Sequence, residues 1–170
     1  MKKKVLIMLF MVIAASSYAQ TVTKNNLPKN IKGARMNLRM DFSDALICGM
    51  SEDEFSRYEK DWEEDKPTIV RNFRSGVNVG IGKSYKVGDY KDSKYTIRVK
   101  VNTITDDGYI ICDADIIDDG GNVYFTVKEV TGGKEPPFMI GTKLARMKIW
   151  ATVTGKKLGS ILKSELPNRE

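Results

Sequence analysis

The chain has 170 residues and no histidine, and its 28 Lys and Arg residues exceed its 22 Asp and Glu residues by six. This length is typical of one ordinary domain. Without histidine, a Ser-His-Asp or Cys-His catalytic arrangement and a histidine-ligated zinc site are excluded.

The N-terminus has the layout of a cleaved secretory signal. Lysines at 2–4 precede an uncharged apolar run at 5–15, and the small residues Ser17 and Ala19 stand three and one positions before the cleavage point at Gln20. The run of about eleven residues is too short for a membrane span, which needs roughly 20. We therefore expect a signal peptide at 1–19 and an exported protein, periplasmic or extracellular.

Export changes the expected partners. No cysteine stands at or just after the cleavage point, so no lipid anchor is predicted, and no second long apolar stretch predicts a transmembrane segment. Removal of the signal leaves 25 Lys and Arg against 22 Asp and Glu, a net charge of +3. Such a mixed surface gives little reason to expect a nucleic-acid partner.

The mature chain is expected to begin with a loose segment and a strand. Residues 20–33 are polar with one proline, so we predict a flexible leader. Residues 34–42 alternate apolar and polar side chains, with the period of two that is typical of a half-buried strand. We place a single α/β domain at 34–170.

Two helices are predicted next. Ser51 and Glu54 match a capping box, which indicates a helix over 52–63. Pro67 suits the first turn of a second helix, which should end in the glycine-rich stretch 76–82. The apolar stripe of this second helix consists of Ile69, Val70, Phe73 and Val77.

The second half of the chain predicts a sheet and its cover. Residues 94–130 read as three antiparallel strands joined by short turns, preceded by a short strand near 84–87 and followed by a loop at 132–141. A long final helix shows apolar residues at helical spacing, namely Leu144, Met147, Ala151, Leu158, Ile161, Leu162 and Leu166. The predicted fold is an α/β (α+β) two-layer sandwich, in which helices cover a mostly antiparallel sheet with a three-strand meander.

Two patterns invite a chemical function that their context does not support. A Gly-Lys-Ser run at 82–84 resembles the end of a phosphate loop, but Val77 stands where the first glycine belongs and the run leaves a helix. The acidic residues at 52–65 are typical of a charged helix face, since a catalytic acid pair needs two carboxylates at a set separation across a cleft.

Aspartates are also concentrated at 106–119, where a hard cation is the functional hypothesis. Ile117 breaks the calcium-loop pattern at its third acid. We therefore interpret these aspartates as turn residues and a solvated strand face, with Arg98 and Lys100 as cross-strand partners. No metal and no cofactor are predicted.

The two cysteines, Cys48 and Cys112, allow two interpretations. Both can be small buried apolar residues, or they can form a disulfide, which an oxidising compartment permits. Cys112 lies on the apolar face of a predicted strand, which favours burial.

Four large apolar side chains are the candidate binding residues. Trp62 and Trp150 lie in predicted helices and would be the best partner-binding anchors if exposed. Phe138 and Met139 lie in the loop at 132–141, which either presents them to a partner or lies tucked under the final helix.

The signal ending SYAQ, the segment MDFSDALICGMSEDEFSRYEKDW, the strands YTIRVKV and NVYFTV and the long final helix together resemble small secreted proteins of Bacteroidetes with no assigned function. This resemblance covers most of the mature chain. The order of strand, helices, meander and helix is also similar to periplasmic accessory domains of the curli-secretion and penicillin-binding-protein-activator type. Neither resemblance transfers a functional residue.

Three functions remain as hypotheses. The leading one is a non-catalytic exported module that binds another protein or an envelope component. The second is a small-ligand-binding protein with a cleft between the sheet and the loop at 132–141. The third is an enzyme, a hydrolase of unrecognised type, that uses carboxylates or Cys48.

The predicted cleavage point can be tested by intact-mass measurement on protein recovered from the periplasm or medium of a bacterial host. The expected mass is that of residues 20–170. The variant Ala19→Arg removes the small residue before the cleaved bond and should leave the precursor uncut. A mature product of unchanged mass from that variant would contradict the predicted site.

Overall fold

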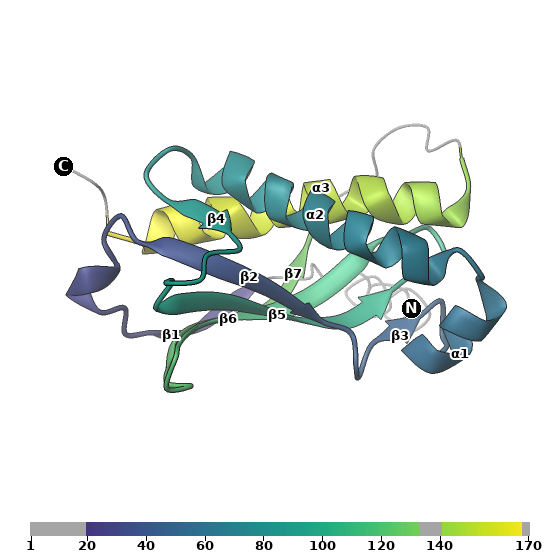
Figure 1. Cartoon of the computed structure of the whole chain (residues 1–170), viewed down its shortest axis with the longest axis horizontal. Helices are drawn as coiled ribbons and strands as arrows, with labels where there is room; N and C mark the ends of the chain where they lie inside the picture. The colour runs from purple at the N-terminus through teal and green to yellow at the C-terminus, as the bar shows by residue number, and fades with distance from the viewer. Residues whose placement is uncertain (1–19, 133–140, 168–170) are drawn as a thin grey trace, which may run out of the picture.

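The structure is a computed structural model that describes residues 20–132 and 141–167, so the predicted signal peptide lies outside the described residues. It is a two-layer sandwich in which two long helices cover one face of a seven-stranded sheet (Figure 1). The strands are β1 (Thr21–Asn25), β2 (Arg35–Asp41), β3 (Leu46–Ile47), β4 (Lys86–Gly88), β5 (Tyr95–Ile104), β6 (Ile110–Asp118) and β7 (Val123–Thr131). The helices are α1 (Glu52–Tyr58), α2 (Trp62–Ile81) and α3 (Lys143–Glu165), with a short 3-10 helix at Lys29–Ile31.

The sheet is mixed, with the order β1-β7-β6-β5-β2-β4, and β3 pairs with the far end of β5. The meander β5-β6-β7 and the pairing of β1 with β7 are antiparallel, whereas β2, β3 and β4 join the sheet through parallel pairings. The predicted fold class is confirmed: an α+β sandwich whose sheet is mostly antiparallel and contains the three-strand meander.

The alternating strands separate two faces of the sheet. One face carries the apolar side chains of β2, β5, β6 and β7, and it packs against the apolar stripes of α2 and α3 in a single core cluster. The opposite face, which we call the open face, carries the alternate polar residues of the same strands. Its central members are Asn37, Arg39, Thr96, Arg98 and Asp115.

Glycine residues allow α2 and α3 to pack with their backbones in close contact. Gly76 and Gly80 of α2 face α3, and a Cβ atom built on either would overlap a backbone carbonyl oxygen, that of Thr152 or Lys156. Gly155 of α3 faces α2 in the same way, because a Cβ there would overlap the carbonyl oxygen of Phe73. The four-residue spacing of small residues allows two helix backbones to approach closely.

A short loop crosses the open face. Because β2 lies between β4 and β5, the connection at 89–94 must pass over β2, and we call it the crossing loop. The Tyr90 N–H donates to Asn37 Oδ1 at 2.6 Å, and Asn37 Nδ2 donates to the Tyr90 carbonyl at 3.1 Å. The Asn37 side chain therefore fastens the crossing loop to the open face.

Residues 20–33 differ from the predicted flexible leader. They form β1, which extends the sheet beyond β7, and the 3-10 helix, whose Ile31 is fully buried. All five residues of β1 are exposed, so this edge strand has no apolar face that a sequence pattern could reveal. The folded unit thus begins at β1, well before residue 34.

The helix predicted over 52–63 is two helices. The capping box at Ser51 is present, but α1 ends at Tyr58, and Trp62 opens α2. Pro67 accordingly lies in the second turn of α2 instead of its first turn. Glycines 76 and 80 lie inside α2 because the contact with α3 requires them, and the helix ends at Gly82 with a positive φ of 78°.

The strand β3 was missed. It ends in a tight turn in which Cys48 and Gly49 both have positive φ, 52° and 79°. The Ile47 N–H donates to the Met50 carbonyl at 2.7 Å, and the Met50 N–H donates back at 3.0 Å. A non-glycine residue in this conformation is uncommon, so the turn has little sequence signal.

We predict that Gly155→Ala destabilises the protein. Alanine favours a helix over glycine by about 1 kcal/mol, but here its methyl group would overlap the Phe73 carbonyl oxygen. Because the overlapped atoms are backbone and cannot rotate away, the upper part of the overpacking cost applies, about 2–3 kcal/mol, and we expect a net loss of about 1–2 kcal/mol in the free energy of unfolding, measured by urea denaturation. Ser75→Ala, at an exposed position of α2, is the control and should change it by less than about 0.5 kcal/mol. Equal or greater stability of Gly155→Ala would contradict the close contact.

Candidate functional site

Trp62 is not a partner-binding anchor. Its side chain is fully buried, with edge-on contacts to Phe42 at 5.8 Å and Phe55 at 5.2 Å between ring centroids. The indole Nε1 donates to Glu52 Oε1 at 3.2 Å. Trp62 therefore joins α1 and α2 to the segment after β2, and the hypothesis of an exposed anchor is wrong for this residue.

Trp150 is also buried, with 1% of its surface exposed, and it stacks on Tyr109 at 4.0 Å between ring centroids. It fixes the turn between β5 and β6 against α3, so it too is a packing residue. Phe138 and Met139 lie outside the described residues, and their predicted binding role stays a prediction.

The two cysteines are free in the structure. Cys112 is buried, as its strand position indicates, and Cys48 is half-buried in the turn after β3. β3 and β6 lie on opposite sides of β5, two strand spacings of about 4.8 Å apart. That separation exceeds the roughly 7 Å that a disulfide can bridge between Cα atoms, so the disulfide alternative is wrong for this fold.

The thiols are also poor nucleophiles. Burial is the main cause that raises the pKa of both Cys48 and Cys112 above the ordinary value. Since the thiolate is the reactive form, a raised pKa leaves little of it at neutral pH. The structure therefore gives no support to an enzyme that uses Cys48.

The aspartates of β6 and its turns bind other residues of the protein through an ion pair and hydrogen bonds. Asp115 Oδ2 lies 2.7 Å from Arg98 Nη2, and Asp115 Oδ1 accepts from Thr126 at 2.8 Å. Asp118 accepts hydrogen bonds from Asn122 and Tyr124. Arg98 is thus the cross-strand partner that was predicted, whereas Lys100, although in register with Asp113, forms its ion pair with Asp44 at 2.8 Å. Within 20–132 and 141–167, no group of three or more acids or cysteines is placed to hold a metal ion.

Two hollows lie on either side of the crossing loop and share Ser93. Both are open depressions with polar walls. The first hollow has a volume of about 440 Å³ and the second about 640 Å³. We take this pair of hollows as the candidate site. The second is lined mainly by residues of the open face, whereas the first lies at the end of the sheet and is also lined by Tyr95, which belongs to the core.

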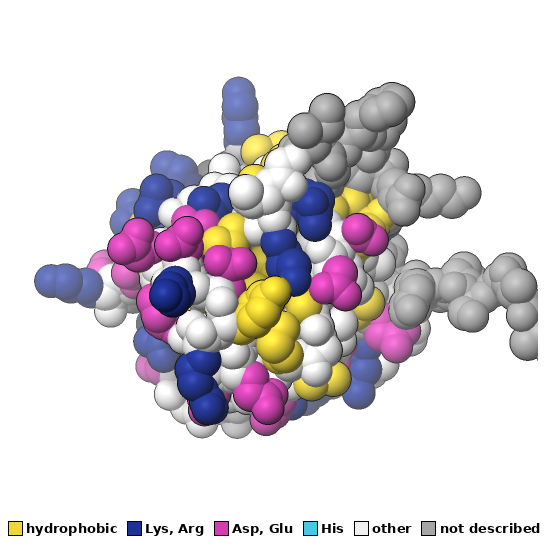
Figure 2. Space-filling view, turned by 90° about the vertical axis from the view of Figure 1, so that its right-hand side faces the viewer, with side chains coloured by type: hydrophobic (Ala, Val, Ile, Leu, Met, Phe, Trp, Pro, Cys, Tyr) yellow, Lys and Arg dark blue, Asp and Glu magenta, His cyan; other side chains and the backbone are white. Residues whose placement is uncertain are grey.

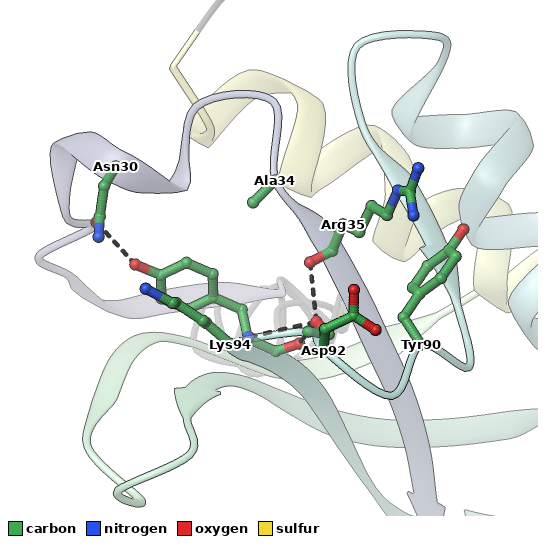
Figure 3. Close-up of a pocket in the computed structure, with 8 residues that line it drawn as sticks. Asn30, Ala34, Arg35, Tyr90, Asp92 and Lys94 are labelled. Carbon is green, nitrogen blue, oxygen red and sulfur yellow. Dashed lines mark hydrogen bonds between the residues drawn. The ribbon is translucent and has the colours of Figure 1, made fainter.

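The first hollow lies where β2 begins (Figure 3). The Arg35 guanidinium lies 5.4 Å from the centroid of the Tyr90 ring, and the close-up shows the two side chains next to each other. On the other side, the Tyr95 hydroxyl donates to Asn30 Oδ1 at 2.7 Å. The lining residues are Asn30, Ala34, Arg35, Tyr90, Asp92, Ser93, Lys94 and Tyr95.

The second hollow covers β2 from Asn37 onward and the beginning of β5, and it reaches the turn after β6. Its floor holds Arg39 and Arg98, which are direct neighbours in the parallel register, with Asn37 and Thr96 one step before them. Lys91 of the crossing loop forms one wall, and Asp118 and Asp119 form the other. Its polar side chains give it donors and acceptors for a ligand.

Two carboxylates of the second hollow, Asp41 and Asp118, are held in the charged form by hydrogen bonds. Hydrogen bonds from Ser43 are the main cause that lowers the pKa of Asp41, and hydrogen bonds from Asn122 lower that of Asp118. A general acid in hydrolysis must be protonated near the working pH, which requires a raised pKa. Neither carboxylate meets this requirement.

A second surface of interest lies at the end of the molecule that carries α1 and β3, where apolar side chains gather (Figure 2). Its exposed apolar residues include Leu46, 52% exposed, and Tyr58, 69% exposed. The Lys143 ammonium lies 5.8 Å from the centroid of the Tyr58 ring. Neither Leu46 nor Tyr58 lines either of the two hollows.

No protein-family profile and no curated protein matches the chain. Among solved structures, a PelC dodecamer from Paraburkholderia phytofirmans is similar over 82% of this chain and 96% of the PelC chain, with 12% identity and a TM-score of 0.41. A single-substitution variant of that PelC covers the same shares, with 10% identity and a TM-score of 0.39. Similarity at this level assigns neither family nor function. None of the described helices is long and apolar enough to cross a membrane.

Thiol chemistry can test the placement of the cysteines. In the native protein, iodoacetamide should modify Cys48 alone, at a rate that still rises above pH 9 because its pKa is raised. Cys112 should react only after unfolding, because it is buried. Intact mass and peptide mapping give the readout, and Cys48→Ala should leave no reactive thiol in the native state. A disulfide-linked product from non-reducing isolation would contradict the structure.

Proposed function

We propose that this chain is an exported, non-catalytic binding module whose ligand is a component of the envelope or of the secreted space. The observation that carries the proposal is the pair of hollows that share Ser93 of the crossing loop. Export is supported by the signal layout at 1–19. The binding surface differs from the tryptophan anchors considered first, since both tryptophans are buried.

The shape of the site favours a large ligand over a small one. Pockets for small molecules enclose most of the ligand and are lined largely by apolar and aromatic groups. The two hollows are open, and their lining is mainly charged or hydrogen-bonding. An extended molecule that lies across the crossing loop would contact both hollows at once.

The rigidity of the site also supports binding. Its floor consists of paired strands, and the crossing loop is held by Asn37 through two hydrogen bonds. Ser93 Oγ lies 2.9 Å from the Arg35 carbonyl and 2.8 Å from the Tyr95 carbonyl, which ties the loop to both β2 and β5. Preorganised groups lose less conformational entropy when they bind.

The proposal can be tested by filling the second hollow. Thr96 lies in its floor, on the open face of β5, so Thr96→Trp should place an indole in the hollow without disturbing the core. The tagged mature chain, residues 20–170, is crosslinked in an envelope fraction of its native host, and captured material is compared between variants. We expect Thr96→Trp to lose at least about nine-tenths of the capture seen with the unmodified chain.

Thr103→Trp is the matched control, because Thr103 belongs to the same strand but not to either hollow. It should retain capture, and both variants should keep the melting temperature within a few degrees. Capture that survives in Thr96→Trp, or that is lost equally in both variants, would refute the assignment of the binding surface.

A further inference from the structure

The charges on the open face follow a rule with two exceptions. Where charged residues of β5 face charged residues of β6, the signs are opposite: Arg98 is in register with Asp115, and Lys100 with Asp113. Asp41 of β2 also faces a cation, Lys100. Opposite charges at such positions stabilise a sheet, and like charges destabilise it.

The exceptions are the two arginines of β2. Arg39 is in register with Arg98 of β5, and Arg35 is in register with Lys86 of β4. Each arginine lines one of the two hollows, Arg35 the first and Arg39 the second. The like-charge neighbours thus coincide with the candidate site.

Arg39 has no anionic partner among the residues at 20–132 and 141–167. Among the residues that the structure describes, its guanidinium forms no ion pair and no hydrogen bond, and it is exposed in the floor of the second hollow. The neighbouring Arg98 binds Asp115 through Nη2 alone, which leaves its other N–H groups available. Two adjacent guanidinium groups provide paired donors that match the oxygens of a carboxylate.

We propose that the two hollows bind an extended polysaccharide that carries carboxylate groups. This inference rests on the proposed function and names its ligand class. One carboxylate binds between Arg39 and Arg98, and a second binds at Arg35, whose guanidinium lies over the Tyr90 ring without an ion pair in the described residues. Arg35 and Arg39 are four residues apart on one strand, about 13 Å, so the two groups belong to separate units of one polymer.

The remaining charges distinguish a polysaccharide from a denser polyanion. Asp92 in the first hollow and Asp119 in the second have no hydrogen bond or ion pair within the described residues. Carboxylates accept hydrogen bonds from sugar hydroxyls, but they repel a chain such as polyphosphate, whose charges lie closer together than those of a polyuronate and which has no hydroxyl groups along its length. The alternation of free cations and free anions matches a chain on which carboxylates and hydroxyls both occur.

The test is a binding titration of the mature chain with polygalacturonate by isothermal calorimetry. The same backbone with its carboxylates methyl-esterified serves as the uncharged polymer, and polyphosphate serves as the alternative polyanion. We expect polygalacturonate to bind, the esterified polymer and polyphosphate to bind at least about tenfold more weakly, and added salt to weaken the interaction.

Arg39→Gln should raise the Kd for polygalacturonate about tenfold or more, since it removes the unpaired guanidinium. Arg39→Lys keeps the charge without the planar fork and should give an intermediate Kd. Arg71→Gln is the matched control: it makes the same change at an exposed position of α2, in the helix layer, and should bind as the unmodified chain does. Monomeric galacturonate should bind at least about tenfold more weakly than the polymer, because it cannot reach both arginines.

Absence of binding to polygalacturonate, equal Kd values for Arg39→Gln and Arg71→Gln, or tighter binding to polyphosphate would each overturn the ligand class. These results leave the proposed function intact as long as Thr96→Trp still loses the capture described above. If Thr96→Trp also retains capture, both the binding surface and its ligand are refuted.

Discussion

The contact between α2 and α3 is the constraint on which the rest of the molecule depends. Gly76 and Gly80 meet Gly155 and Gly159 so closely that no side chain fits between the helices. The helices also run in the same direction, since later positions of α2 meet later positions of α3. The pair therefore acts as one narrow layer whose apolar stripes both point at the sheet. Outside the contact, Asn72 donates to the Lys148 carbonyl at 3.1 Å and continues the same alignment.

A single helix layer covers only one face of the sheet, and this sets the character of the other face. The strands β2 and β5 therefore alternate buried apolar residues with polar residues that remain in water. The parallel arrangement of β2, β4 and β5 then forces a loop to cross that polar face, and Asn37 holds it there. The two hollows result from this crossing, so the candidate site follows from the topology of the chain.

The sequence predicted an element correctly where its apolar residues followed a single strand or helix periodicity. The alternation in 94–130 predicted the meander, and the apolar spacing in 144–166 predicted α3, because both elements bury one face against the core. Prediction from the sequence failed where a contact with a distant segment determines the local structure. β1 is exposed on every residue and is defined only by its partner β7. Glycines that normally weaken a helix are retained in α2 because the facing backbone leaves no room for a methyl group.

The candidate site was hidden for a related reason. Arg39 and Arg98 each fit the polar half of an ordinary strand pattern, and only the parallel register of β2 with β5 makes them neighbours. Conversely, Trp62 and Trp150 stood out in the sequence because of their size, yet large aromatic rings are most often used in cores. A usable signal was the run of charged and turn residues at 89–94, too short to be an element and placed between two strands.

The pairing of β1 with β7 has a consequence for the order in which the protein folds. Thr21 is in register with Lys128, so the first strand of the sheet finds its partner more than 100 positions later in the chain. Contacts between residues so distant in sequence form slowly, because loop closure must come first. A chain that emerges from a ribosome or a translocation channel with its N-terminus first keeps β1 without its partner until β7 has followed. During that interval β1 is an unpaired strand, and its unsatisfied backbone N–H and C=O groups are open to pairing with strands of other chains.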